Sequence, residues 1–192
     1  MQTCAITRPP VLREGPAINE HERILATAGR KSDLWREDLL VQMLTRHAGR
    51  RVLIVDNNPA DRVRMGELLA AARLVLDFAA DGAEAITRAS DRPADLVLMN
   101  VRLPVMDGLT AARVLRRLPF ARAVPIVAMS EGCIDDEYAS YFVAGMDDVV
   151  AKPFVADAVH RRLLRWLDRR AAAANAAWRL PAPSAVVARI ND

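Results

Sequence analysis

The sequence predicts an α/β protein with an open, five-stranded parallel sheet that is doubly wound, so that helices cover both faces. Short apolar runs recur along the chain, most clearly at residues 52–55, 96–99 and 126–129. Runs of this length that are rich in β-branched residues are typical of strands buried on both faces. Helical stretches separate the runs, and strands that alternate with helices form parallel sheets through right-handed crossovers.

An N-terminal segment precedes this pattern. Residues 1–18 hold several prolines and little apolar periodicity, which predicts a flexible arm. Residues 19–49 are predicted to form a helical extension, with helices over 19–29 and 32–48 and a stop at Gly49. The second helix has a broad apolar face, made by Leu34, Trp35, Leu39, Met43 and Leu44. We expect this face to dock on the rest of the chain or on a second copy.

The predicted α/β domain covers residues 50–170. Weaker apolar runs at 74–78 and 149–151 complete the five strands. The helices are expected at residues 59–72, 82–90, 108–117, 134–144 and 155–171. Residues 171–192 hold an Ala-rich run and two prolines, and they are predicted to be a partly disordered C-terminal tail.

Three of the predicted helices carry capping residues at their starts. Asn58 is a plausible N-cap and is followed by Pro59, which is favoured at the first helical position. Asp81 is followed three residues later by Glu84, the spacing of a capping box. Asp107 is most simply a turn and helix cap, and we assign it no chemistry.

Composition indicates a globular chain and limits its location. Of 192 residues, 52% are apolar, 27% charged and 5% aromatic, which suits an aliphatic core. No apolar run approaches the roughly 18 residues of a membrane span. Residues 1–10 lack the apolar stretch of a signal peptide, so we expect a cytoplasmic protein with no membrane partner. Cys4 and Cys133 share no spacing with the histidines, so neither a disulfide framework nor a zinc site is expected.

Polar residues follow four of the predicted strands. Open parallel sheets bind ligands outside the carboxyl ends of their strands. The positions after the strands hold Asp56, Asn57, Asn100, Ser130, Glu131 and Lys152. Lys152 stands out because the chain has 25 arginines and only two lysines. We treat these six residues as one candidate site.

Four motifs occur in order at these strand ends: VLIVDNNPADR at 52–62, DLVLMNVRLPVMDG at 95–108, PIVAMS at 125–130 and AGMDDVVAKPF at 144–154. Together they make the chain resemble the receiver domain of two-component response regulators. The resemblance is closer to the receivers attached to hybrid sensor histidine kinases. It extends from about residue 51 to residue 167 and implies a flavodoxin-like receiver fold.

The resemblance also implies roles for the residues at the first and third strands. In the family, two adjacent acidic residues after the first strand hold Mg²⁺, and here that pair is Asp56 and Asn57. The third strand of the family ends in the aspartate that accepts a phosphoryl group from a histidine kinase. Here that position is Asn100.

The fourth and fifth strands show matches and departures of the same kind. Ser130 matches the switch hydroxyl of the family, and Lys152 matches its lysine. Glu131 replaces the small residue that usually follows the hydroxyl, and Val149 stands at the aromatic switch position.

A neutral amide at position 100 changes the chemistry that the resemblance implies. A phosphoacceptor must be a carboxylate, because its oxygen attacks phosphorus and forms an acyl phosphate. Asn57 and Asn100 also remove two negative charges from the metal cage, so we expect weak or no Mg²⁺ binding and no other cofactor. Instead, Asp56 and Lys152 are expected to neutralise each other, with Asn100 accepting from Lys152 and donating to Asp56 or to a backbone carbonyl.

These departures predict a pseudo-receiver, a non-enzymatic module that acts in signal transduction through phosphorylation-independent protein–protein interaction. The expected partners are a histidine kinase, a phosphotransfer protein or a response-regulator component, and a homodimer is a further possibility. By resemblance the contact surface covers residues 134–170. Its candidate residues are Tyr138, Tyr141, Phe142, Val149, Arg162 and Trp166.

Two alternatives remain open. The chain could be a phosphorylatable receiver of a two-component phosphorelay that uses another acceptor residue. It could instead be a small-ligand or nucleic-acid binder that reuses the receiver fold. Five arginines lie between residues 161 and 170, and we favour a solvated helix face over a site for nucleic acid or an acidic protein.

Overall fold

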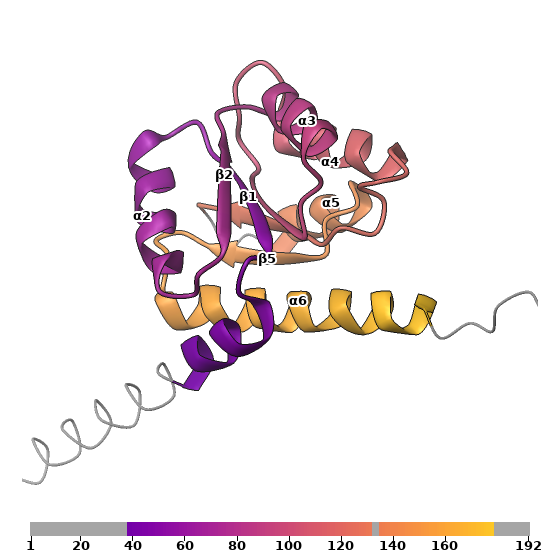
Figure 1. The fold of residues 1–192 in the computed structure, drawn as a ribbon. Helices are drawn as coiled ribbons and strands as arrows, with labels where there is room; N and C mark the ends of the chain where they lie inside the picture. Colours follow the sequence, from indigo (N-terminus) through magenta and orange to yellow (C-terminus); the bar gives the residue numbers. More distant parts are fainter. Residues whose placement is uncertain (1–37, 132–134, 179–192) are drawn as a thin grey trace, which may run out of the picture. The chain divides into compact units, whose positions relative to one another are not determined.

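The computed structural model describes residues 38–131 and 135–178. The arm predicted for residues 1–18 and the helix predicted for 19–29 lie outside the described residues, as does the end of the predicted tail. The described residues form the predicted α/β sandwich, with a parallel sheet between two layers of helices (Figure 1).

The five strands of the sheet are all parallel and lie in the order β2-β1-β3-β4-β5. Their bounds are β1 Arg51–Val55, β2 Val75–Ala79, β3 Leu96–Asn100, β4 Ile126–Ser130 and β5 Asp148–Ala151. The helices are α2 Pro59–Ala70, α3 Gly82–Asp91, α4 Gly108–Arg117, α5 Asp135–Val143 and α6 Ala156–Trp178. The predicted fold class and all five predicted strands are therefore confirmed.

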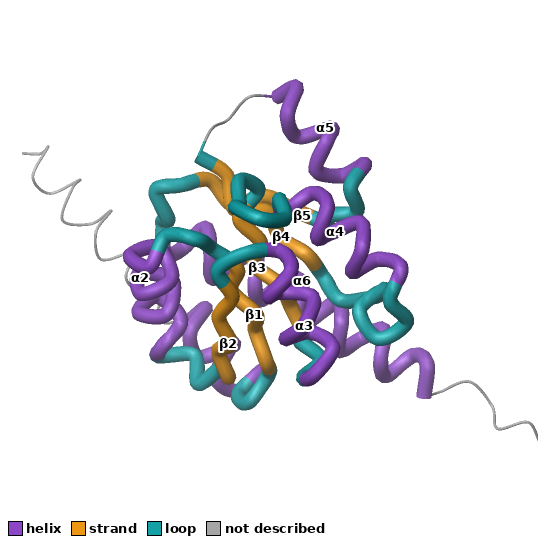
Figure 2. The backbone as a smooth tube through the Cα atoms, turned by 90° about the horizontal axis from the view of Figure 1, so that it is seen from above, coloured by secondary structure: helices purple, strands orange, loops and turns teal. Residues whose placement is uncertain are grey.

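Two apolar clusters form the core, one on each face of the sheet. One face packs against α3 and α4, through residues such as Ala85, Ala111 and Leu115. The other face packs against α2 and α6, through residues such as Met65 and Leu163. Figure 2 shows the sheet between these helices. Because β3 and β4 are buried along their whole length, their apolar runs carry no alternation of polar residues.

The predicted caps set where three helices begin. The side chain of Asn58 accepts from the backbone N–H of Ala60, and that of Asp107 accepts from Thr110. Asp81 accepts from the backbone N–H of Glu84, whose carboxylate accepts in return from Ala80 rather than from Asp81 itself. The backbone N–H of Ala80 lowers the pKa of Glu84, and that of Thr110 lowers the pKa of Asp107. These carboxylates therefore stabilise the fold at neutral pH and lose that effect as pH falls through their lowered pKa values.

The last part of the N-terminal extension packs on the face covered by α2 and α6. Residues 38–47 are helical and end before Gly49, whose φ of +79° suits glycine. Met43 is fully buried in the core cluster of this face, and Leu39 and Leu40 pack against the same cluster. The described part of the predicted apolar side, with Leu39 and Met43, thus docks on its own chain. Leu34 and Trp35 lie outside the described residues.

Polar contacts reinforce this docking. His47, only 2% exposed, lies with its Nε2 2.9 Å from Oδ1 of Asp168 on α6. Arg46 donates to the other carboxylate oxygen of Asp168 at 3.2 Å. Helix α6 continues to Trp178, past the predicted end at residue 171, because its last turns are rich in alanine, the best helix former. Among the described residues, no helix is both long and apolar enough to span a membrane.

The docking of residues 38–47 can be tested by truncating its buried side chain. Met43→Ala should lower the free energy of unfolding by about 2–5 kcal/mol, because it removes buried methylene groups and leaves a cavity. Val41 lies on the same helix and is 55% exposed, so Val41→Ala should change stability by less than about 0.5 kcal/mol. Urea denaturation measures both, and equal effects of the two substitutions would contradict the packing.

Candidate functional site at the carboxyl edge of the sheet

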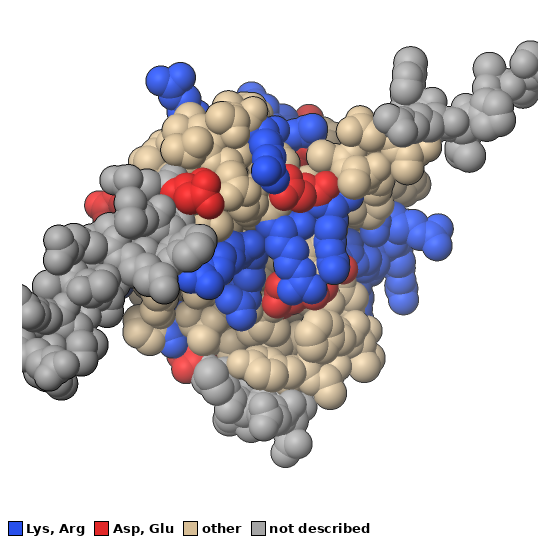
Figure 3. Space-filling view, turned by 90° about the horizontal axis from the view of Figure 1, so that it is seen from below, with Lys and Arg blue, Asp and Glu red and all other residues tan. Residues whose placement is uncertain are grey.

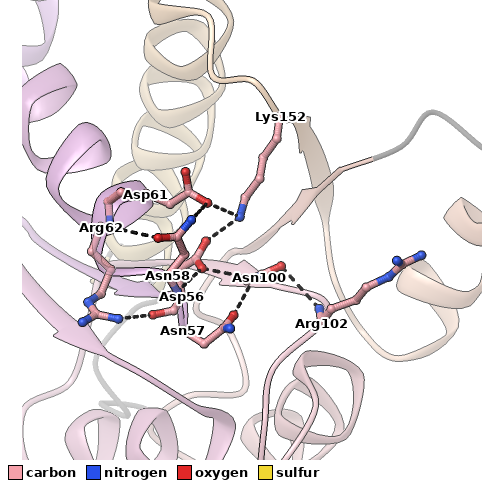
Figure 4. Close-up of polar contacts among 9 residues, drawn as sticks. Asp56, Asn57, Asn58, Asp61, Arg62, Asn100, Arg102 and Lys152 are labelled. Carbon is pink, nitrogen blue, oxygen red and sulfur yellow. Dashed lines mark hydrogen bonds and ion pairs between the residues drawn. The ribbon is translucent and has the colours of Figure 1, made fainter.

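The strand register brings the predicted site residues to one edge of the sheet. Val55 of β1 pairs with Met99 of β3, so Asp56 and Asn100, which follow them, lie next to each other. Lys152 follows β5 and reaches back across the edge to Asp56 (Figure 4). Sequence separations of 44 and 96 residues are thereby reduced to hydrogen-bonding distance.

Asp56 is the centre of a hydrogen-bond network. Its side chain is fully buried, and its Oδ2 accepts from Nζ of Lys152 at 2.7 Å. Its Oδ1 accepts from the backbone N–H of Asn58 at 2.9 Å and from Nδ2 of Asn100 at 3.2 Å. A buried carboxylate requires compensation of this kind, because an unpaired charge in the interior is strongly unfavourable.

Asn100 is fixed by bonds at both ends of its amide. Its Nδ2 donates to Asp56 and, at 3.2 Å, to Oδ1 of Asn57. Its Oδ1 accepts from the backbone N–H of Arg102 at 3.3 Å rather than from Lys152, which corrects part of the predicted arrangement. An ionised carboxylate only accepts hydrogen bonds, so the amino group of Asn100 must face Asp56.

Glycine at position 108 allows the neighbouring helix to approach Asn100. A Cβ atom built on Gly108 would collide with the backbone carbonyl of Asn100. The backbone N–H of Gly108 donates to the carbonyl of Val101 at 3.0 Å, which holds the start of α4 against the end of β3. Glycine at position 108 therefore has a steric reason, in addition to the predicted capping role of Asp107.

Lys152 is held between two carboxylates. Its Nζ lies 2.7 Å from Oδ2 of Asp56 and 2.8 Å from Oδ2 of Asp61, and one tenth of its side chain is exposed. Burial by itself lowers the pKa of Lys152, but the hydrogen bonds and charges of Asp56 and Asp61 outweigh it and raise the pKa above its usual value. The ammonium group is therefore charged at neutral pH.

Asp61 is the site residue that the sequence reasoning missed. It lies in the first turn of α2, whereas the other members of the site follow strands. Its Oδ2 accepts from Lys152 and, at 3.3 Å, from Nδ2 of the N-cap Asn58. The available signal was an acidic residue within the first turn of a helix that begins beside Asp56.

The two candidates after β4 differ in their surroundings. Oγ of Ser130 is 3.2 Å from the hydroxyl of Tyr141, which belongs to α5, and either oxygen can donate. The carbonyl of Ser130 accepts from the backbone N–H of Lys152 at 2.7 Å. Glu131 is exposed to solvent. The structure thus joins Asp56, Asn57, Asn100 and Lys152 in one cluster and leaves the side chain of Ser130 facing α5.

The donor set does not fit a magnesium ion. Mg²⁺ prefers anionic oxygen ligands in an octahedral arrangement. Asp56 is the only buried carboxylate in the network, and both its oxygens already accept hydrogen bonds. The side-chain oxygens of Asn57 and Asn100 also accept bonds, from Asn100 and Arg102 respectively. Among the described residues no cluster of three or more His, Cys, Asp or Glu side chains is placed to hold a metal ion.

The expected contact residues differ in their exposure. Phe142 is 54% exposed, whereas Tyr141 is only 2% exposed and therefore belongs to the core rather than to a partner surface. Tyr138 packs edge-on against Tyr141 with ring centroids 5.8 Å apart, because residues three apart share one face of a helix. Tyr141 belongs to the core cluster, and Tyr138 packs against it. Val149 is also partly buried against that core.

The two candidates on α6 share one acidic partner, Asp148. Nε1 of Trp166 donates to Oδ2 of Asp148 at 2.9 Å, and the indole packs against the core on its other side. Nε of Arg162 lies 3.5 Å from Oδ1 of Asp148. Trp166 is therefore half-buried, and its polar edge is already satisfied.

The fold and this edge define a class of protein: a five-stranded parallel sheet whose first strand is followed by a buried aspartate and whose last is followed by a lysine that pairs with it. Residues 52–164 match the family model of the response regulator receiver domain. The match spans more than half of the chain, so the chain belongs to the response regulator receiver domain family.

Several relatives of this chain are larger proteins that match it over only part of their length. The signal transduction histidine-protein kinases BarA of Shigella flexneri and Escherichia coli (strain K12) are 34% and 33% identical over 115 residues, which cover 60% of this chain and 12% of each kinase. The transcription factor SKN7 of Saccharomyces cerevisiae is 32% identical over 127 residues, covering 66% of this chain and 20% of SKN7. The matched stretch is thus a small part of each of these relatives.

Solved structures show the same fold. The receiver domain of the sensor histidine kinase PA1611 from Pseudomonas aeruginosa PAO1, with magnesium coordinated in its active-site cleft, is 34% identical with a TM-score of 0.60. That comparison covers 63% of this chain and 99% of the PA1611 domain. A putative response regulator from Chloroflexus aurantiacus is 27% identical with a TM-score of 0.61, covering 63% and 99% of the two chains.

The raised pKa of Lys152 predicts a pH-dependent contribution to stability. Lys152→Met should lower the free energy of unfolding by about 3 kcal/mol at neutral pH, because it leaves the buried carboxylate of Asp56 without its cation. A folded-state pKa above the unfolded value means that the stabilisation is complete below about pH 10.4 and is lost as pH rises through the folded pKa. The difference in the free energy of unfolding between wild type and variant should therefore shrink above about pH 10.4.

Urea denaturation of both proteins at pH 7, 9 and 11 measures this gap. Arg161→Met, at an exposed position of α6, is the control for loss of one positive charge. A gap that stays constant across this pH range would contradict the charged state assigned to Lys152.

Proposed function

We propose that this receiver domain is a pseudo-receiver, which works in two-component signalling through protein contact and is not switched by phosphorylation. The observation that carries the proposal is Asn100. It occupies the end of β3 beside Asp56, where a receiver of this family holds its phosphoacceptor aspartate, and an amide oxygen is too weak a nucleophile to form an acyl phosphate. On this proposal the domain has no enzymatic activity of its own.

The charge balance of the pocket supports the same proposal. The PA1611 receiver, by its description, coordinates magnesium in its active-site cleft. In the present chain, Lys152 is paired with Asp56 and Asp61, and Asn57 and Asn100 are neutral. A lost carboxylate at about 4 Å weakens attraction for a cation by about 4 kcal/mol per unit charge at an effective dielectric of 20, before water replaces it. Magnesium binding would therefore be weak or absent, and the phosphoryl chemistry that depends on it would be lost.

The surface of α5, β5 and α6 is the proposed site of contact with a signalling partner. Phe142 and Val143 stand side by side on α5 and are 54% and 82% exposed. Adjacent exposed apolar side chains favour a protein interface over solvent. Arg162 and Trp166 add a cationic and an aromatic group beside Asp148. A histidine kinase, a phosphotransfer protein or a response-regulator component is the expected partner class.

The arrangement of charge on α6 argues against a nucleic-acid site. Figure 3 shows Lys and Arg side chains gathered in a band that includes acidic side chains. Arg161 pairs with Asp157 at 3.4 Å, and Arg170 lies 3.6 Å from Asp95. Binding to nucleic acid draws on an unbroken set of cations that replace counterions along the phosphates. Carboxylates within the band would repel those phosphates, so the solvated helix face remains the favoured interpretation.

Labelling with a small acyl-phosphate donor and Mg²⁺ tests the proposal directly. The wild-type chain should gain no phosphoryl group by intact-mass spectrometry. Asn100→Asp should label weakly, because the second acid is still missing at Asn57. Asn57→Asp added to Asn100→Asp should label more than the single variant, and Glu131→Ala should raise labelling again by removing a repulsive charge.

Magnesium titration of the same proteins, followed by amide shifts, supplies the control. Site-localised binding should be absent in the wild type below about a millimolar and appear in the variant with two restored aspartates. Phosphoryl transfer to the wild-type chain would overturn the pseudo-receiver proposal. Equal labelling of Asn100→Asp and the combined variants would overturn the argument from the metal cage.

Substitutions on α5 test the contact surface. Phe142→Glu should weaken capture of the cognate kinase or phosphotransfer protein at least tenfold, because it places a charge at an apolar anchor. The loss should be the same with and without an acyl-phosphate donor. Val63 is 60% exposed on α2, so Val63→Glu is the matched control away from this surface. An equal loss in the two variants, or none in either, would count against this surface.

A further inference from the structure

The ammonium group of Lys152 has one partner, Asp61, that does not come from a strand end. Lys152 is equally close to Asp56 and to Asp61, at 2.7 and 2.8 Å. Asp56 is fully buried and shares its charge with the backbone of Asn58 and the amide of Asn100. Asp61 is 25% exposed and comes from α2 rather than from the sheet.

A second carboxylate is needed because the other polar neighbours are neutral. Only one tenth of the Lys152 side chain is exposed, and an ammonium group removed from water requires compensating charge and hydrogen bonds. The amide of Asn100 donates toward Asp56, so it adds no acceptor for Lys152. Because the carboxylate of Asp56 accepts hydrogen bonds from three donors, Asp61 supplies the remaining negative charge that Lys152 requires.

Local structure places Asp61 for this task. It lies in the first turn of α2, where the helix dipole and free backbone N–H groups favour a negative side chain. Asn58 caps the same helix through its Oδ1 and donates through its Nδ2 to Oδ2 of Asp61. The carboxylate is thereby turned toward the edge of the sheet, where Figure 4 shows it beside Lys152.

We propose that Asp61 is the positioning residue of this pocket, the counter-ion that takes the place of a carboxylate at position 100 and holds Lys152 against α2. This inference rests on the proposed function, since it explains how a pocket without an acceptor aspartate keeps its lysine. Asp56, Lys152 and Asp61 then form an ion triad in the pocket. In this state the ammonium group is bound to two internal carboxylates and is not free to bind an incoming phosphate.

A double-mutant cycle between positions 61 and 100 tests the exchange of charge. Asp61→Asn should lower the folding equilibrium constant by on the order of tenfold, a modest factor because Asp61 is partly exposed. Asn100→Asp alone should also lower it, since three carboxylates would surround one ammonium group. In the Asp61→Asn background, however, Asn100→Asp should raise the constant, because it restores the missing negative charge. Such a reversal of sign is coupling and not additivity.

A spectroscopic measurement separates positioning from general stability. The chain contains only two lysines, so Lys31→Arg leaves Lys152 as the single source of lysine ammonium signals. Its protons should exchange slowly in the wild-type pocket, rapidly in Asp61→Asn, and slowly again when Asn100→Asp is added. Asp61→Glu, which keeps the charge, should retain the slow signal. Glu67→Gln, an exposed position on the same helix, is the control and should combine additively with Asn100→Asp.

Each outcome bears on one conclusion. If Asn100→Asp lowers the folding constant equally in both backgrounds, or if Asp61→Asn leaves the ammonium signal unchanged, the role of Asp61 is overturned. If Asp61→Asn does not fold, recovery of folded protein in the double variant supports the proposal, and failure to recover overturns it. The cycle uses no phosphoryl donor, so its failure is distinguishable from labelling of the wild type, which would overturn the proposed function alone.

Discussion

The buried ion pair between Asp56 and Lys152 connects parts of the sheet that do not touch each other through the backbone. In the strand order, β3 and β4 lie between β1 and β5, so the lysine spans two strands to reach its carboxylate. Charges in the interior are tolerated only when they are paired. The end of β5, the start of α2 and the orientation of Asn100 must therefore all be compatible with one placement of this pair.

The amide at position 100 is consistent with that constraint. An aspartate there would place a second carboxylate against buried Asp56, and like charges at this distance oppose ionisation. Asn100 keeps nearly the same shape but donates a hydrogen bond to Asp56 and accepts one from the backbone of Arg102. The polar groups at the end of β3 are here satisfied by hydrogen bonds within the chain.

Periodicity predicted the fold well because parallel strands buried on both faces must be apolar throughout. The network around Asp56 was largely predictable, because the carboxyl ends of parallel strands lie at the same edge of a sheet. The role of Asp61 was not, because a first-turn acid on a helix is usually a solvated residue that favours the dipole. The burial of Tyr141 was also missed, since an aromatic on an amphipathic helix can face either way until the helix is placed on the sheet. The length of α6 was underestimated because apolar periodicity fades in its alanine run, where intrinsic propensity alone sustains the helix.

Because the helix over residues 38–47 packs on the core, the part of the chain that should fold as one unit is longer than the family match. The family match begins at residue 52 and ends at residue 164, inside α6. Met43 and Leu167 lie outside that stretch, yet both are almost fully buried in the same apolar cluster. Excision or domain transplantation at the limits of sequence similarity would remove these two side chains from the cluster and expose part of that face of the sheet to water. The stretch that matches the family is thus shorter than the stretch that packs together. A fragment for expression or a chimera should include the longer of the two.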